Sequence, residues 1–352
     1  MRSVLAKGIP HAMRSVFLFL GWGFFFPAVL CCQNDGKEKE IRLALEKGTR
    51  FLSRIQRPDG AICDTLNPLF DTWETVLAAT ALYETNGKDT NQIILKRALA
   101  YLRLQENAQG LICHNKRCKE AYCLETTAVY FLLLIETGKA EKISARAKTI
   151  LDLQKPTGEW MVGNPDVREQ KDFSSVTGFA LALLQALDWK STYQEEALRW
   201  LLDHQTSEGD WGSAWEYYDC PAYALWPVLR ALYPQHSEEA EWAKQKATQY
   251  IRSRQNADGS WEVTSTRDKR PSSALHTSLM LAAAKYIEYA EKAVQVDRAI
   301  DFLLAQQQAD GSWDGGFFPI DSKTYVKKEY VFATAQAMMA LQDYLIQQQK
   351  GK

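Results

Sequence analysis

Apolar residues recur at helical spacing along most of the chain, in two alternating kinds of segment. The first kind, seen in ALEKGTRFLSRIQ, ILKRALAYLRLQ and EEALRWLLDHQ, has apolar residues at i, i+3, i+4 and i+7 with charges between them. That spacing is typical of a helix with one buried face. The second kind, seen in ETVLAATALYET, ETTAVYFLLLIETG and TGFALALLQAL, is apolar nearly all round and predicts a fully buried helix. The alternation predicts an outer layer of half-exposed helices around an inner layer of buried ones.

A short polar motif follows the half-exposed segments six times. It reads QRPDGAIC, QENAQGLIC, QKPTGEW, QTSEGDW, QNADGSW and QQADGSW, and its glycines recur every 48 to 52 residues, at Gly60, Gly110, Gly158, Gly209, Gly259 and Gly311. Glycine accepts the left-handed conformation that ends a helix. Six units in register predict one all-α domain, residues 38–349, in which six helix pairs close into a double ring, an (α/α)6 toroid.

The N-terminus has a different pattern. Residues 16–30 form an apolar run that ends at Cys31 and Cys32. The run is too short for a comfortable membrane span and is typical of the apolar part of a signal peptide. A run that ends in Cys also resembles a bacterial lipoprotein signal, in which the lipid is attached to a Cys, here Cys32 or Cys31. We therefore expect residues 1–32 to be the signal, residues 33–37 a short linker, and the protein to be exported and anchored by lipid in the membrane of a bacterial cell envelope.

Composition and charge narrow the possible partners. The chain has 352 residues, of which 46% are apolar and 24% charged, with a net charge near −1. This composition is that of an ordinary globular protein with enough length for a large core. The near-neutral balance and the lack of a basic stripe give no support for nucleic-acid binding.

Five cysteines follow the apolar N-terminal run, at Cys63, Cys113, Cys118, Cys123 and Cys220. In an oxidising compartment some of them should pair, and three lie close together in CHNKRCKEAYC, so we expect a local disulfide there. An odd number leaves at least one thiol, and Cys220 is our candidate because it is distant from the others in sequence.

The six motifs resemble the QW repeats of squalene and oxidosqualene cyclases. The pairing of outer and inner helices is similar to the toroid that these enzymes share with the β subunits of protein prenyltransferases. In that family the Gln and Trp of each repeat are structural and clamp the end of the outer helix. The matching residues are Gln154, Trp160, Gln205, Trp211, Gln255, Trp261, Gln307 and Trp313. The first two repeats have Ile62 and Ile112 instead of Trp, followed by Cys63 and Cys113, so a bridge between these equivalent cysteines is an alternative pairing.

The resemblance implies that the first turns of the inner helices face a central cavity. We align these turns on the small residue that opens each buried segment: Thr75, Thr126, Thr177, Ala222, Thr277 and Thr334. The polar residues just before them are candidate site residues: Asp71, Glu74, Glu125, Asp219, Cys220 and His276. The helix dipole favours acids at these positions whatever their role.

The string FDTWET resembles the Asp-x-Asp-Asp-Thr motif of cyclases that start by protonating their substrate. It matches at Asp71, at Thr75 and, as Glu, at Glu74, but Trp73 occupies the place of the central acid that delivers the proton. A proton donor to an alkene must be a carboxylic acid that stays neutral until it reacts. Asp71 and Glu74 are therefore candidate catalytic acids, and the structural alternative is a capping box with Asp71 as N-cap.

The string WEYYDCPAYALW has three interpretations. Asp219 resembles the donor acid in the Asp-Cys-Thr-Ala-Glu motif of oxidosqualene cyclases, although Pro221 replaces the Thr and no Glu follows. Cys220 and His276 match the zinc-binding Cys and His of prenyltransferase β subunits, whose Asp position is Tyr218 here, one place from Asp219. The candidate metal ligands are therefore Asp219, Cys220 and His276, and three such protein ligands with one open position suit zinc. The third interpretation is structural, with Asp219 as a helix cap before Pro221 and a buried thiol.

Aromatic residues are frequent near the expected starts of the inner helices. They are candidates for binding a substrate, because aromatic faces attract carbocations, and they also fill cores. With one acid, the candidate substrate-binding residues are Trp73, Tyr122, Glu125, Trp215, Tyr218 and Trp226. We expect an isoprenoid or similar hydrophobic ligand in the central cavity, converted by acid-initiated cyclisation if the protein is an enzyme. The alternatives are zinc-dependent prenyl transfer and a non-catalytic toroid that carries a ligand or binds a protein.

Overall fold

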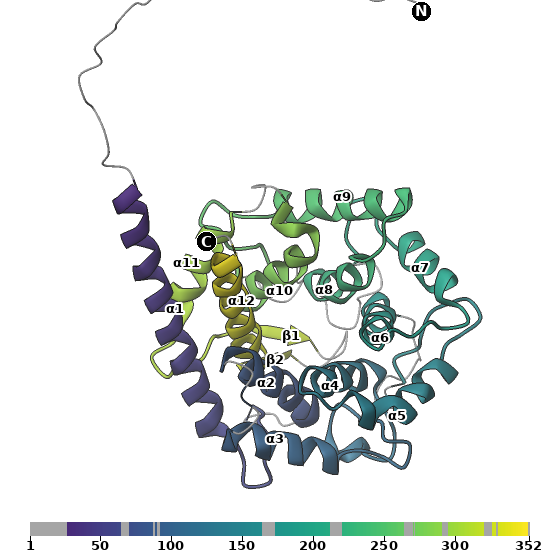
Figure 1. Ribbon diagram of the computed structural model, residues 1–352. Coiled ribbons are helices and arrows are strands. Elements are labelled where there is room, and N and C mark those ends of the chain that lie inside the picture. Colours follow the sequence, from purple (N-terminus) through teal and green to yellow (C-terminus); the bar gives the residue numbers. More distant parts are fainter. Residues whose placement is uncertain are drawn as a thin grey trace, which may run out of the picture. The chain divides into compact units, whose positions relative to one another are not determined.

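Figure 1 shows a computed structural model of the protein. The chain divides into two compact units, Met1–Lys39 and Glu40–Lys352, and each is described by itself. The structure describes residues 27–64, 70–86, 89, 92–163, 173–211, 220–263, 270, 272–290, 295–319, 326–328 and 330–350.

Two kinds of helix alternate along the described chain. The outer helices are α1 (Pro27–Ile55), α3 (Ile93–Leu104), α5 (Ala140–Asp152), α7 (Gln194–Asp203), α9 (Glu238–Ser253) and α11 (Val296–Gln306). The inner helices are α2 (Asp71–Thr85), α4 (Leu124–Glu136), α6 (Ser174–Ala186), α8 (Pro221–Leu232), α10 (Ala274–Ala284) and α12 (Val331–Lys350). Two short helices, η2 (Lys116–Cys118) and η4 (Lys285–Ala290), and an antiparallel pair of strands, β1 (Phe317–Pro319) and β2 (Val326–Lys328), complete the described elements.

The inner helices of the second unit form a closed ring. Each contacts the next in the order α2, α4, α6, α8, α10, α12, and α12 contacts α2 again (Figure 1). Burial follows the sequence pattern: every residue of α4 from Leu124 to Leu134 is buried, whereas α3 buries only one face, with Leu95, Ala98, Tyr101 and Leu102. The predicted toroid of half-exposed outer and buried inner helices is confirmed, and the short strand pair is an addition that the helical periodicity did not indicate.

The repeated Trp side chains bind their own outer helices, and the repeated Gln side chains join neighbouring helix pairs. The indole Nε1 of Trp160 donates to the carbonyl oxygen of Ile150 at 2.7 Å, and Trp211, Trp261 and Trp313 make the same bond to their own outer helices. All four rings are fully buried. The amide Nε2 of Gln154 donates to the carbonyl oxygens of Gly158 at 2.8 Å and of Tyr193 at 3.0 Å, and thus reaches the next repeat.

The same contacts close the ring between the last repeat and the first. Gln307 Nε2 donates to the carbonyl oxygens of Gly311 at 3.1 Å and of Ala44 in α1 at 2.9 Å. Gly311 has φ +93°, and a Cβ atom there would lie 2.3 Å from the carbonyl oxygen of Lys47. Only glycine fits this approach, because the position needs both a left-handed backbone and no side chain.

The cysteines pair locally. Cys113 and Cys118 form a disulfide, whereas Cys63, Cys123 and Cys220 are buried thiols. The prediction of a local disulfide is confirmed, and Cys220 is one of the remaining thiols. The alternative bridge between Cys63 and Cys113 is wrong, because the short loop after Cys113 already brings Cys118 to its sulfur.

The expected signal peptide lies largely outside the described residues, which begin at residue 27. Cys31 and Cys32 fall within α1, and residues 33–37, expected as a linker, are helical as part of it. The second compact unit begins at Glu40. Among the helices that the structure describes, none has both the length and the hydropathy to cross a membrane.

Candidate functional site

Threonine hydroxyls mark the true register of the inner helices. Thr75 Oγ1 accepts the backbone N–H of Ile62 at 2.9 Å, and Thr177, Thr277 and Thr334 accept the equivalent N–H groups of their repeats. In the second repeat this role belongs to Thr127, which accepts from Ile112 at 3.1 Å. The alignment on Thr126 is therefore wrong by one residue, an error that two adjacent threonines made possible.

The two acids of FDTWET are buried, and both bind neighbouring loops. Glu74 Oε2 accepts the backbone N–H of Asp64 at 2.7 Å. Asp71 Oδ1 accepts the backbone N–H of Lys116 at 3.0 Å, and its Oδ2 lies 3.8 Å from Arg57 Nη1. The N-cap of α2 is Phe70, without a side-chain cap bond. The capping box with Asp71 as N-cap is therefore wrong: these carboxylates hold loops of two repeats together.

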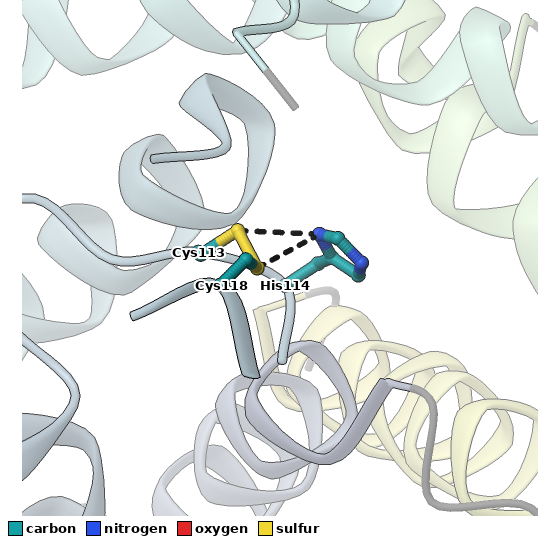
Figure 2. A group of neighbouring side chains, drawn as sticks. All are labelled: Cys113, His114 and Cys118. Carbon is teal, nitrogen blue, oxygen red and sulfur yellow. Dashed lines mark hydrogen bonds between the residues drawn. A yellow bond between two sulfur atoms is a disulfide. The ribbon is translucent and has the colours of Figure 1, made fainter. Parts of the chain in front are cut away.

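A disulfide loop from the second repeat takes over the capping of α2. The carbonyl oxygen of His114 accepts the backbone N–H groups of Thr72 at 3.2 Å and of Trp73 at 3.0 Å. His114 follows Cys113, and its Nδ1 lies 3.4 Å from the Cys113 sulfur and 3.6 Å from that of Cys118 (Figure 2). These three side chains form a compact group with the spacing of metal ligands. Their sulfurs are bonded to each other, so the group acts as a covalent brace for the start of α2.

The structure brings Cys220 and His276 together across 56 residues of sequence. The Cys220 sulfur lies 3.4 Å from His276 Nε2, and both side chains are buried. The other ring nitrogen of His276, Nδ1, is 2.9 Å from the hydroxyl of Ser273. Cys220 is the N-cap residue of α8, with Pro221 in the first turn, so the expectation that Asp219 caps this helix is wrong. Asp219, expected as the third ligand or as a proton donor, lies outside the described residues.

Aromatic rings fill the centre of the inner ring. Trp73 packs edge-on against Tyr223 at a centroid distance of 6.1 Å and against Phe332 at 6.3 Å. Phe179 contacts Trp226 edge-on at 5.1 Å and Tyr223 at 6.2 Å. We call these five residues, from α2, α6, α8 and α12, the central aromatic cluster. Edge-to-face geometry at these distances is favourable.

Two of the other expected substrate-binding residues, Tyr122 and Glu125, make contacts outside this cluster. The ring of Tyr122 packs on Gly163, where a Cβ atom would lie 2.0 Å from it. Glu125 is buried beside Cys123, and burial, together with the Glu125 charge, raises the pKa of the Cys123 thiol to about 12. Trp215 and Tyr218 lie outside the described residues.

A cavity opens towards the C-terminal ends of the inner helices. Its volume is about 50 Å³, and its apolar lining includes Phe179 and Trp226 of the central aromatic cluster together with Met339. The amide of Gln336, which is 1% exposed, also lines it. The sequence pattern does not indicate this cavity, because the candidate residues that it offers lie at the first turns of the inner helices.

Five charged residues surround the cavity, and we call them the charged rim: Glu84, Glu136, Arg230, Lys285 and Asp343. Lys285 Nζ lies 2.8 Å from Asp343 Oδ1, and Arg230 Nη2 lies 3.8 Å from Glu136 Oε1. Glu84 is half-buried, and burial together with the charges of Asp343 and Glu136 raises its pKa to about 8. A carboxyl group with this pKa is mostly neutral at pH 7. The sequence contains one signal for this rim: buried helices such as those containing ALYET and LLLIE have an acid in their last turn.

The double ring of helices around a central aromatic cluster defines a toroid of the terpenoid-cyclase class. The family model of the squalene-hopene cyclase C-terminal domain matches residues 165–344, just over half of the chain. The chain belongs to this family.

The curated relatives that match are longer proteins. Alpha-onocerin synthase from Lycopodium clavatum is 23% identical over 325 residues, which cover 89% of this chain and 41% of the relative. A lanosterol synthase from Aspergillus fumigatus is 26% identical over 161 residues, 44% of this chain and 21% of the relative. The chain therefore spans less than half the length of these relatives.

Solved structures show the same fold at the scale of the whole chain. The type II terpene cyclase MstE from Scytonema, solved with its substrate geranylgeranyl dihydroxybenzoate, superposes with a TM-score of 0.68 at 17% identity. The match covers 88% of this chain and 98% of the cyclase. At this identity the likeness establishes the fold alone.

Proposed function

We propose that this protein binds an isoprenoid-type hydrocarbon in the centre of its inner ring. The observation that carries the proposal is the central aromatic cluster, whose rings come from helices distant in sequence and two of which, Phe179 and Trp226, line a cavity. Such rings give a hydrocarbon a large apolar contact and attract cationic character along a polyene. The family membership and the substrate of the structural neighbour support the same ligand class.

Binding requires the cavity to enlarge. Its volume of about 50 Å³ holds a few water molecules, whereas ligand pockets are typically about 300–1,000 Å³. Met339 borders the cavity and is an unbranched side chain that changes rotamer at low cost. We infer that Met339 and Trp226 move aside when a hydrocarbon enters.

The test is the binding of farnesene, an isoprenoid hydrocarbon, measured by tryptophan fluorescence on the purified protein. We expect saturable binding that Trp226→Ala weakens at least tenfold. The matched control is Trp242→Ala, since Trp242 is 63% exposed on the outer helix α9. Binding that is absent, or that both variants weaken equally, would exclude the centre of the ring as the site.

If the protein is an enzyme, we propose that it converts the bound isoprenoid by acid-initiated cyclisation. This reaction needs a neutral acid next to the hydrocarbon. Asp71 and Glu74 are occupied by loop contacts, which supports a structural role for them. Glu84 lines the cavity, and Asp219 keeps its proposed role as a donor. Incubation with squalene and with farnesol, followed by mass spectrometry of the products, tests turnover, and Glu84→Gln and Asp219→Asn separate the two acids.

The second candidate function is zinc-dependent chemistry at Cys220 and His276. The 3.4 Å separation of Sγ and Nε2 favours it, because ligands bonded to one tetrahedral zinc lie about 3.5 Å apart. Ser273 beside Nδ1 supplies the partner that orients a ligating His. Bound zinc would activate a thiolate or a water there. Metal analysis of the purified protein should give near-stoichiometric zinc that Cys220→Ala and His276→Ala each abolish and that Cys123→Ala, a control at another buried thiol, retains.

We also propose that the protein is exported and anchored by a lipid on Cys32 or Cys31. The apolar run of residues 16–30 before these cysteines supports the proposal. Metabolic labelling with an alkyne fatty acid should modify the protein, and Cys31→Ser combined with Cys32→Ser should abolish the label. Retention of the label in the double variant would contradict this anchoring.

A further inference from the structure

We propose that the polar lining of the cavity, which includes Gln336 and Glu84, is a subsite for an uncharged oxygen of the ligand, and that it selects isoprenoid alcohols over diphosphates. The inference rests on the proposed binding of an isoprenoid in the central cavity. It assigns the polar end of that ligand and the residues that hold it.

The first observation is the buried amide of Gln336. The side chain is 1% exposed and lines the cavity, and its Nε2 makes no hydrogen bond with any residue that the structure describes. A buried N–H donor without a partner destabilises the folded protein, because it has lost its hydrogen bonds to water. A ligand hydroxyl satisfies this amide in either of its two orientations, because a hydroxyl both donates and accepts. The cavity therefore contains a binding group for an uncharged oxygen.

The second observation is the charge balance of the rim. Lys285 faces Asp343, and Arg230 faces Glu136, so two cations are matched by two carboxylates. A diphosphate site needs cations that are not already neutralised by the protein. Glu84 faces all four of these groups, and its raised pKa leaves it uncharged near pH 7. Its protonated carboxyl is then a donor for an oxygen, and it adds no charge that would attract a cation.

The third observation is the direction of the cavity. Trp226 and Phe179 belong to the central aromatic cluster and also line the cavity, whereas Arg230 and Lys285 at the rim are 24% and 34% exposed. One wall is therefore apolar and the other is polar and reached by solvent. A ligand that fits both walls has its hydrocarbon chain among the rings and its oxygen towards the polar groups of the lining.

The test compares three probes on the purified protein: farnesol, farnesyl diphosphate and farnesene. We expect farnesol to bind at least tenfold more tightly than farnesyl diphosphate and more tightly than farnesene at pH 7. Gln336→Leu should remove the preference of farnesol over farnesene while farnesene binding persists. Tighter binding of the diphosphate, or an unchanged alcohol preference in Gln336→Leu, would overturn the subsite.

The dependence of farnesol affinity on pH tests Glu84 directly. Because only the protonated carboxyl donates, the affinity should fall about tenfold between pH 7 and pH 9, and farnesene affinity should not. Glu84→Gln should make farnesol binding independent of pH, whereas Glu239→Gln, a control at an exposed position of α9, should retain the fall. A fall that persists in Glu84→Gln would refute the assignment. Farnesene binding that survives while the alcohol preference fails would overturn the subsite alone, and loss of all binding would overturn the proposed function as well.

Discussion

The two ends of the inner ring hold buried or half-buried carboxylates in opposite settings. At the start of α2, Asp71 and Glu74 accept backbone N–H groups from the loops of two repeats. At the far end of the same helix, Glu84 borders a cavity and lies among other charged side chains. In the first setting each carboxylate accepts a backbone N–H group that ties it to a loop, and in the second the carboxyl remains able to exchange a proton. A motif-like position is therefore a weaker guide to chemistry than the groups that surround an acid.

The largest effect that sharpens this comparison is expected at Glu74. Glu74→Ala leaves a space in a fully buried position and removes the acceptor of the Asp64 N–H. We expect the free energy of unfolding to fall by about 3 kcal/mol. Urea denaturation measures it, with Glu239→Ala on the exposed face of α9 as the control. A loss under about 1 kcal/mol would contradict the structural role of Glu74.

At the opposite end of α2 we expect replacement of the acid to increase the free energy of unfolding. The pKa of Glu84 is about 8 in the folded protein and about 4.3 in an unfolded chain. Between these values the folded protein holds a proton that the unfolded chain has lost, so stability falls as pH rises through this window and levels off above pH 8. Glu84→Gln removes this loss of stability, because glutamine does not titrate.

The full shift would make the Glu84→Gln variant more stable than the parent protein by about 5 kcal/mol at pH 8. Because Glu84 is only half-buried and solvent screens its charge, we expect about 2 kcal/mol at pH 8 and nearly equal stability at pH 4. Urea denaturation at both values measures the difference. A variant that is destabilised at pH 8, as Glu74→Ala is expected to be, would remove the contrast between the two ends.

A comparable effect of about 2 kcal/mol is expected from opening the disulfide that braces α2. The bridge between Cys113 and Cys118 closes a short loop, and closing so short a loop contributes about 2 kcal/mol in the chain-entropy model. Cys113→Ser with Cys118→Ser should lower the unfolding free energy by this amount and increase amide exchange at Thr72 and Trp73, whose N–H groups bind the His114 carbonyl. Unchanged exchange at these two amides would show that the loop does not depend on the bridge.

The smallest expected effect is at Cys123. Burial and the Glu125 charge raise the pKa of its thiol to about 12, so almost no thiolate is present at pH 8. Alkylation of the native protein with iodoacetamide should leave Cys123 unmodified until the chain is denatured, as peptide mass spectrometry will report. Rapid labelling of Cys123 would show that the first-turn end of the ring opens to solvent.

The fold could be predicted from the sequence because each repeat shows the same pattern of a half-exposed helix, a glycine turn and a buried helix. The six repeat glycines, from Gly60 to Gly311, mark helix ends at a nearly constant interval. The inner helices are recognisable as buried from their apolar composition alone. Trp73 and Trp226 were also predictable as members of one aromatic cluster, since the aligned first turns bring their helices to one centre. The pairing of Cys220 with His276 followed from the same alignment.

Other parts of the site depend on contacts that periodicity does not encode. The cap of α2 comes from His114 in the next repeat, so no local pattern indicates it. Glu84 ends an apolar helix in the way that many solvent-exposed acids do, and only the closed ring places it beside Asp343, more than 250 residues away in sequence. Gln336 lies within a buried helix, where its lack of a partner becomes visible only in three dimensions.

The bond between Gln307 and Ala44 joins residues 263 positions apart. Contacts of that sequence separation form only after the entropy of closing a long loop has been overcome, and they slow folding. In an open array, each unit depends on its neighbours, and the ends unfold first. Here the first and last repeats bind each other through Gln307 and Ala44, a contact that we call the seam. We expect this contact to form last during folding, when the final helix pair packs against the first. The seam thereby couples the earliest and the latest synthesised parts of the toroid into one cooperative unit.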